Sequence, residues 1–272
     1  MKSSRNATGL RAYAIGYLIF LYAPIALLPI FAFNDSRIIA FPLGGFTTNW
    51  FAEMWADRQL WQALKNSLII SGSTAVIATV LGVFGARAST RYSFPGKGGL
   101  VGLIMLPLVL PEMIVAMSLL VVLLAISVPL SIFTVILGHV LITTPFAVAI
   151  LSSAFQSLDK SLEEAAYDLG EGPVSTFRLI ILPLVAPGII SSLLICFTIS
   201  LDEFIIAYFL AGADTVLSSY IYGQFRFPAK VPAMLALGTI LVLVSVILLS
   251  IAEFFRRRGI AKTGGKDTGG FL

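Results

Sequence analysis

Uncharged, mostly apolar stretches alternate with short charged segments along almost the whole chain. The clearest of these stretches are residues 12–33, 66–86, 179–201 and 231–252. A longer stretch, residues 98–158, contains only one glutamate and one histidine as charged or basic groups and has room for two crossings. Because about 20 apolar residues in a helix cross the hydrocarbon core of a bilayer, the pattern predicts an all-α membrane protein with six transmembrane helices.

The six predicted helices belong to one transmembrane domain, residues 1–258, and the glycine-rich end of the chain, residues 259–272, is predicted to be disordered. Pro107 and Pro111 lie about one helical turn apart, so we expect the third helix to be bent or broken. A tight turn near Ser127 joins the third helix to the fourth. The predicted spans are residues 12–33, 66–88, 100–126, 131–154, 184–210 and 232–254.

Composition agrees with a membrane protein. Hydrophobic residues make up 58% of the chain and charged residues 12%, and the mean hydropathy is +0.96. Soluble domains average about 25% charged residues, so the charge here is too sparse to cover a water-facing surface. This excludes a soluble enzyme, a disordered regulator and a nucleic-acid-binding module. The single cysteine, Cys196, excludes an intramolecular disulfide and a cysteine-cluster metal site, and we expect no metal site.

The positive charges predict the orientation in the membrane. Lys and Arg residues accumulate in cytoplasmic loops, and six crossings place both termini on the same side. Most of the 18 Lys and Arg residues fall on that side, so both termini are predicted to be cytoplasmic. The residues concerned are Lys2, Arg5, Arg11, Arg87, Arg91, Lys97, Lys160, Arg178, Arg256, Arg257, Arg258, Lys262 and Lys266.

One predicted cytoplasmic loop, residues 156–183, is acidic although the other loops on that side are basic. A solvated acidic loop is one interpretation. Ala165 and Ala166 favour another, because small residues beside acids permit the close approach of a second protein. We therefore expect a docking element for a cytoplasmic partner. Its acids are Asp159, Glu163, Glu164, Asp168 and Glu171.

The same loop contains signals for helix boundaries. Ser161 and Glu164 have the spacing of a capping box, and Gly170 suits the left-handed residue that ends a helix. Pro173 suits the first position of a second short helix. These signals predict a helix–turn–helix outside the bilayer, with Pro183 breaking or kinking the chain as it re-enters the membrane.

The loop also resembles a known motif. It reads Glu164-Ala165-Ala166, three residues, Gly170, nine residues, Ile180, one residue, Leu182-Pro183. This pattern is similar to the EAA motif of bacterial ABC importer permeases, and we name residues 156–183 the EAA loop. The resemblance implies a type I ABC importer permease of the inner membrane, in which this loop supplies the coupling helix that docks on a separate ATPase. The residues assigned to ATPase coupling are Glu163, Glu164, Ala165, Ala166, Gly170, Ile180, Leu182 and Pro183.

The resemblance also implies partners and a nucleotide site elsewhere. The sequence contains no Walker-type glycine loop, so ATP and Mg²⁺ are expected on the partner ATPase, a homodimer. No cofactor is expected on this chain, and the chain is expected not to be an enzyme. The other expected partners are a second homologous permease, an extracytoplasmic solute-binding protein and membrane lipid, with no nucleic acid.

Several short segments resemble the spermidine/putrescine branch of these permeases and, within it, the second permease subunit. This implies transport of a small cationic solute, a polyamine such as spermidine or putrescine. One alternative is the same machinery for another small solute, such as an amino-acid derivative or an opine-like compound. Another is an ion-coupled secondary transporter, whose usual mark, an internal repeat, is not found in the chain. The segments are Leu21-Tyr22-Ala23-Pro24, Phe33-Asn34, Pro111-Glu112 and Ser200-Leu201-Asp202-Glu203.

Three acids, Glu112, Asp202 and Glu203, are predicted in the membrane or at its edge. An ionised group at mid-bilayer costs at least about 2–3 kcal/mol, so it normally faces protein or a water-filled cavity. We expect at least one of the three to line the pathway of a cationic solute; the alternative is helix capping or an interface with the partner permease. The only histidine, His139, has no sequence neighbour for a proton relay and is expected to be a hydrogen-bonded packing residue.

Overall fold

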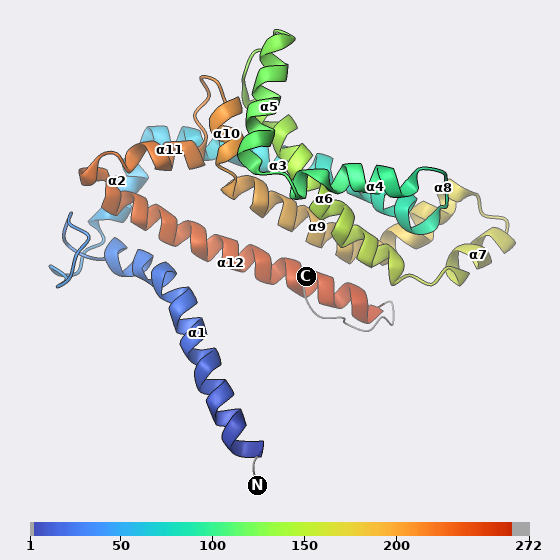
Figure 1. Ribbon diagram of the computed structural model, residues 1–272, viewed down its shortest axis with the longest axis horizontal. Coiled ribbons are helices and arrows are strands. Elements are labelled where there is room, and N and C mark those ends of the chain that lie inside the picture. The colour runs from blue at the N-terminus through green and yellow to red at the C-terminus, as the bar shows by residue number, and fades with distance from the viewer. Residues whose placement is uncertain (1–2, 263–272) are drawn as a thin grey trace. The chain divides into compact units, whose positions relative to one another are not determined.

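The computed structural model describes residues 3–262, which form helices joined by loops, with no strand within this range (Figure 1). The chain packs as two compact units. The first comprises the described residues up to Leu60 together with Ile221–Val244. The second comprises Trp61–Tyr220 and the described residues from Ser245 onward.

The first unit contains α1 (Ser3–Ala32), α2 (Asn49–Ala56) and the beginning of α12 (Val231–Lys262). The indole N–H of Trp50 in α2 donates to the carbonyl of Asn34, 2.8 Å away, and fixes the loop that follows α1. The buried apolar side chains that hold the unit together are Phe31, Ala32, Trp50, Leu235 and Ala236.

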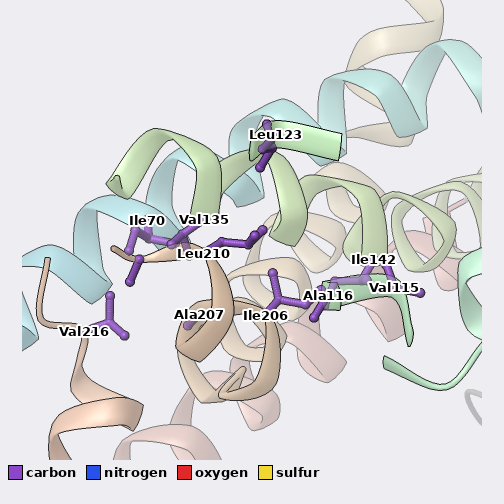
Figure 2. Packing of buried hydrophobic residues seen from close by; sticks show 11 residues of the cluster. Ile70, Val115, Ala116, Leu123, Val135, Ile142, Ile206, Ala207, Leu210 and Val216 are labelled. Atoms are coloured by element: carbon purple, nitrogen blue, oxygen red, sulfur yellow. The ribbon is translucent and has the colours of Figure 1, made fainter. Parts of the chain in front are cut away.

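The second unit is arranged along α6 (Ile132–Gln156), which packs against α9 (Leu182–Asp202) and against α10 (Ile205–Leu210). One apolar core joins α6 and α10 to α5 (Glu112–Ala125). Figure 2 shows the side chains of this core, including Ile206 and Ala207 of α10 and Ala116 of α5. A second core lies toward the other end of α6, and its buried members are Ala86, Leu151, Phe155, Leu158, Ile181 and Val185.

Gly138 allows α6 and α10 to approach closely. A Cβ atom at this position would lie 2.5 Å from Cγ2 of Ile206 and 2.9 Å from Cδ1 of Leu210. Only a residue without a side chain fits this contact, because real Cβ atoms do not approach other carbon atoms so closely. The contact fixes α10, and therefore the segment between α9 and α10, against the middle of the unit.

Five helices among the described residues are long and apolar enough to cross a membrane, and a sixth span is obtained if a bent helix pair is counted as one. That pair consists of Lys97–Leu108, which combines α4 (Lys97–Met105) with the turn η1 (Leu106–Leu108), and α5. The two parts are bent by 102°. The prediction of a broken third helix is therefore confirmed, with the break between Leu108 and Glu112.

The fifth predicted span differs from the structure at both ends. The helix begins at Pro173 and continues to Asp202, with a π-helical turn, η2 (Phe177–Ile181), immediately before Pro183. Of the two predicted alternatives at Pro183, a break or a kink, the continuous helix contradicts the break. A π turn shifts the backbone hydrogen bonds by one residue, which lets a helix include a residue that has no N–H to donate. At the other end, the predicted span 184–210 is interrupted after Asp202, and α10 begins at Ile205.

The end of the chain also differs from its prediction where it can be compared. α12 continues to Lys262, so residues 259–262 are helical, although they were predicted to belong to a disordered tail. The rest of the predicted tail, residues 263–272, lies outside the described residues.

Candidate functional site

The EAA loop forms two short helices separated by a sharp turn. The first is α7 (Ser161–Asp168), and it is terminated by Gly170 two residues later, whose φ of +88° is left-handed. The N–H of Glu171 donates to the carbonyl of Ala166 (3.0 Å) and that of Gly170 to the carbonyl of Tyr167 (2.9 Å), which is the Schellman pattern of a helix end. The second helix, α8 (Pro173–Thr176), begins at its proline. Both predicted boundaries are confirmed.

The predicted capping box at the start of α7 is wrong. The N–H of Ser161 donates to Oδ1 of Asp159, 2.9 Å away, so Asp159 supplies the acceptor in place of the serine side chain. This hydrogen bond lowers the pKa of the exposed Asp159 carboxyl below its usual range. The Glu164 carboxylate is left exposed, with no hydrogen bond to the start of the helix among the described contacts.

One side of the EAA loop is anchored and the other is exposed. Ala166 and Thr176 are buried, whereas Ala165 is exposed beside Glu164. Near the turn, the apolar side chains of Leu169 and Val174 are 85% and 81% exposed. Exposed apolar groups of this size beside an acidic group are typical of a protein–protein contact surface. The arrangement can therefore accept a partner protein at the turn.

The last positions of the motif lie where the loop joins the long helix. Ile180 is half-buried on the π turn, and Leu182 and Pro183 are exposed at the start of α9. Between them, Ile181 is 1% exposed and belongs to the second core. The structure thus connects the EAA loop to the core of the second unit through this turn.

Glu163 occupies a different environment from its neighbour Glu164. Its Oε1 lies 3.0 Å from Nε of Arg91, and its Oε2 lies 3.9 Å from Nη2 of Arg87. The closer contact is not aligned as a hydrogen bond, so it is an ionic contact. Arg87 and Arg91 entered the sequence analysis only as orientation charges. Their i, i+4 spacing at the end of a predicted span was the available signal that they share one face.

The membrane acids lie near the opposite end of α9. Glu112 is the first residue of α5 and is exposed, and Asp202 is the exposed last residue of α9. Glu203 is half-buried, and its Oε1 accepts the N–H of Ile206 at 2.8 Å. The carboxylates of Glu112 and Glu203 lie within electrostatic range of each other. Within the described part of the chain, no Lys or Arg forms an ion pair with any of the three acids.

Glu203 also accepts a second interaction through its backbone, because the Ser218 hydroxyl donates to its carbonyl at 3.0 Å. This residue therefore caps α10 and links it to α11 (Leu217–Gln224). His139 lies buried in α6 with Nδ1 2.7 Å from Oγ of Ser200, which confirms its predicted packing role. The described residues contain no group of three or more His, Cys, Asp or Glu side chains that could hold a metal ion.

Comparison with known proteins identifies the family. Residues 78–259, which include the EAA loop, match the family described as binding-protein-dependent transport system inner membrane component. The chain belongs to this family. It is therefore a multi-pass inner-membrane transport protein and not an enzyme, as the sequence predicted.

Named relatives cover most of the chain. The putrescine transport system permease protein PotI of Escherichia coli (strain K12) is 35% identical over 231 residues, covering 82% of each chain. The spermidine/putrescine transport system permease protein PotC of Haemophilus influenzae is 31% identical over 255 residues, covering 93% of this chain and 96% of the relative. These similarities agree with the resemblance found in the sequence.

Solved structures share the fold. A bacterial ABC transporter involved in the import of the acidic polysaccharide alginate has a chain with a TM-score of 0.70 at 15% identity, covering 95% of this chain and 98% of that chain. An inward-facing MetNI methionine ABC transporter gives a TM-score of 0.56 at 16% identity, covering 78% of this chain and 98% of that chain. The predicted all-α permease fold is confirmed.

Proposed function

We propose that the chain is one permease subunit of an ATP-driven importer that carries putrescine, spermidine or a closely related polyamine. The observation that carries this proposal is the 35% identity to a putrescine permease over 82% of both chains. Family membership alone does not distinguish between solutes, because the same fold serves alginate and methionine transporters. The relatives' names and the placement of acidic groups in this chain favour a cation.

In this proposal the EAA loop docks the ATPase. Glu164, Ala165, Leu169 and Val174 present a charged and apolar surface around the turn, and Gly170 shapes that turn. ATP and Mg²⁺ bind to the ATPase homodimer and not to this chain. Closure of the ATPase pair pulls the loop, and the loop moves α9 through the π turn. A permease with two alternative conformations then changes the side to which its pathway opens.

The acids at the opposite end of α9 serve the cationic solute. A polyamine carries spaced ammonium groups, and each must exchange its hydration shell for charge-assisted hydrogen bonds. Glu112 and Asp202 are exposed acids on different helices and supply such spaced acceptors. Glu203 contributes negative charge, but part of its carboxylate already caps α10.

The remaining partners follow from the orientation predicted by the Lys and Arg distribution. The EAA loop faces the cytoplasm, where the ATPase lies. The acidic end of the second unit opens toward the extracytoplasmic solute-binding protein, which delivers the polyamine. A second homologous permease, which the family resemblance implies, completes the pathway.

The solute assignment is tested in proteoliposomes that contain the complete complex. Radiolabelled putrescine, spermidine, a basic amino acid, an opine and a sugar are each offered with the solute-binding protein, with and without ATP inside. We expect ATP-dependent uptake of the polyamines and none of the sugar. ATP-dependent uptake of only the opine or only the amino acid would show that this compound, and not a polyamine, is the solute. Uptake without ATP would contradict the ABC importer mechanism.

A further inference from the structure

The two adjacent glutamates at the start of the EAA motif do not have the same role. Glu164 is exposed, whereas the Glu163 side chain is 13% exposed and lies between the guanidinium groups of Arg91 and Arg87, whose side chains are 9% and 14% exposed. Charges this far removed from water are screened weakly by salt and solvent. A surface that binds the ATPase would not use an acid already enclosed by its own chain.

The two arginines make further contacts that join separate segments. Nη2 of Arg91 donates to the carbonyl of Leu158, 2.8 Å away and two residues after the end of α6. The Arg87 guanidinium lies over the ring of Phe177, 4.7 Å from its centroid, at the start of the π turn. Together with Glu163, the two arginines therefore connect α3 (Arg58–Arg91) to α7, to the end of α6 and to η2.

The energetics favour movement of these segments as one body. A buried charge that loses its partner is strongly destabilising, because neither water nor another charge replaces the lost interaction. Arg87 also follows Ala86, which is fully buried in the second core with Leu158 and Ile181. When the EAA loop moves, keeping the ion pairs intact requires the end of α3 to move with it.

We propose that Arg87, Arg91 and Glu163 form an arginine clamp that transmits movement of the EAA loop to α3. Glu163 is then a positioning residue that acts inside the chain, not a residue that contacts the ATPase. The inference rests on the proposed function to the extent that the EAA loop docks the ATPase. It adds a second route of coupling, through α3, to the direct route through η2 and α9.

The test uses the complete importer in proteoliposomes with polyamine as the solute. The variants are Glu163→Gln, Arg91→Gln and the conservative Arg91→Lys, which keeps a positive charge beside Glu163. Arg178→Gln is the matched control, because it removes a charge from an exposed arginine of the same loop that is not part of the proposed docking surface. Two quantities are measured for each variant: the amount of ATPase that co-purifies, and the polyamine taken up per ATP hydrolysed.

We expect Glu163→Gln and Arg91→Gln to retain the ATPase while uptake per ATP falls about fivefold or more, the lower range of measured coupling between sites. Arg91→Lys should give a ratio between those of the unmodified chain and Arg91→Gln, because a lysine keeps a positive charge beside Glu163, and Arg178→Gln should match the unmodified chain.

Two results would overturn the clamp. Release of the ATPase by Glu163→Gln would make Glu163 a docking residue, and an unchanged uptake per ATP in both single variants would remove the coupling role. Failure of the docking proposal can be distinguished from failure of the clamp alone, because Glu164→Arg would then retain the ATPase and transport normally. That result would overturn the clamp's role in coupling as well.

Discussion

Two pairs of adjacent acids lie at opposite ends of α9, and the structure treats them differently. In the EAA loop, Glu163 is enclosed by two arginines and Glu164 is exposed. At the other end, Glu203 caps a helix and Asp202 is exposed. In each pair one acid stabilises the fold through contacts within the chain, and its neighbour is exposed and can bind a partner or a solute.

The difference lies in the charge that surrounds each pair. The arginines offset the acid that is enclosed in the EAA loop, so this end has a defined structure and one free acid for a partner protein. The other end receives no Lys or Arg ion pair among the described residues, and Glu112 adds further negative charge. An acidic site that is not neutralised within the chain favours a cationic solute.

Reversing the exposed charge of the EAA loop should have the largest effect. Glu164→Arg places a positive charge on the proposed ATPase surface, and we expect ATPase affinity to fall at least about 30-fold, as for a residue central to an interface. Co-purification and ATP-driven uptake measure the effect. Arg178→Glu reverses an exposed charge elsewhere on the same loop and should leave both nearly unchanged; equal loss in the two variants would contradict a specific surface.

Neutralising the exposed acids at the other end should lower transport without affecting the ATPase. Glu112→Gln and Asp202→Asn should each reduce polyamine uptake about tenfold, because a charge-assisted hydrogen bond contributes roughly 1.5–3 kcal/mol. Initial uptake rates over a range of polyamine concentrations measure this.

Glu203→Gln provides the internal comparison for these two variants. Its amide oxygen still accepts the N–H of Ile206, so the cap of α10 is retained and uptake should fall less. Unchanged uptake kinetics in both Glu112→Gln and Asp202→Asn would show that these acids do not line the pathway.

Filling the close contact between α6 and α10 should lower the stability of the fold. Gly138→Ala places a methyl group against Ile206 and Leu210, and we expect a loss of about 1–3 kcal/mol in stability from overpacking. Thermal unfolding in detergent measures the loss. Gly102→Ala is the control, because no atom lies within 4 Å of the added carbon; a similar loss in both would contradict the packing explanation.

The smallest expected effect concerns the start of α7. The folded pKa of Asp159 is lower than the unfolded one, so its hydrogen bond to the N–H of Ser161 stabilises the helix at neutral pH. This stabilisation is present above about pH 4 and is lost as the pH falls through the folded pKa. NMR titration of the carboxyl should show the lowered pKa, and a midpoint at the usual value would contradict it.

Local signals in the sequence predicted local features of the EAA loop. Gly170 and Pro173 determine the turn through their own backbone preferences, which depend on no distant partner. The capping-box prediction failed because Asp159 offers a competing acceptor two residues before Ser161. The uncharged stretch 179–201 ends where the helix is interrupted after Asp202, but the predicted span was continued to residue 210. The capping of α10 by Glu203 marks the new helix start.

Interactions between distant segments could not be predicted. The pairing of Glu163 with Arg87 and Arg91 depends on how α3 packs beside α7, and nothing in either segment alone specifies it. Glu163 and Glu164 were therefore both predicted to couple to the ATPase. On a helix, neighbours point about 100° apart, and the structure shows that only Glu164 is exposed.

Cysteine cross-linking tests most directly whether the EAA loop docks the ATPase. The chain has a single cysteine, Cys196, which is buried, so Cys196→Ser provides a background for Ala165→Cys. The control is Ala125→Cys, at an exposed alanine where α5 ends. This position precedes the start of α6, whereas the EAA loop follows the end of α6. We predict that Ala165→Cys cross-links to the ATPase in the assembled importer and that Ala125→Cys does not. Equal cross-linking at both positions, or none at Ala165→Cys in a complex that transports polyamine, would contradict the assignment.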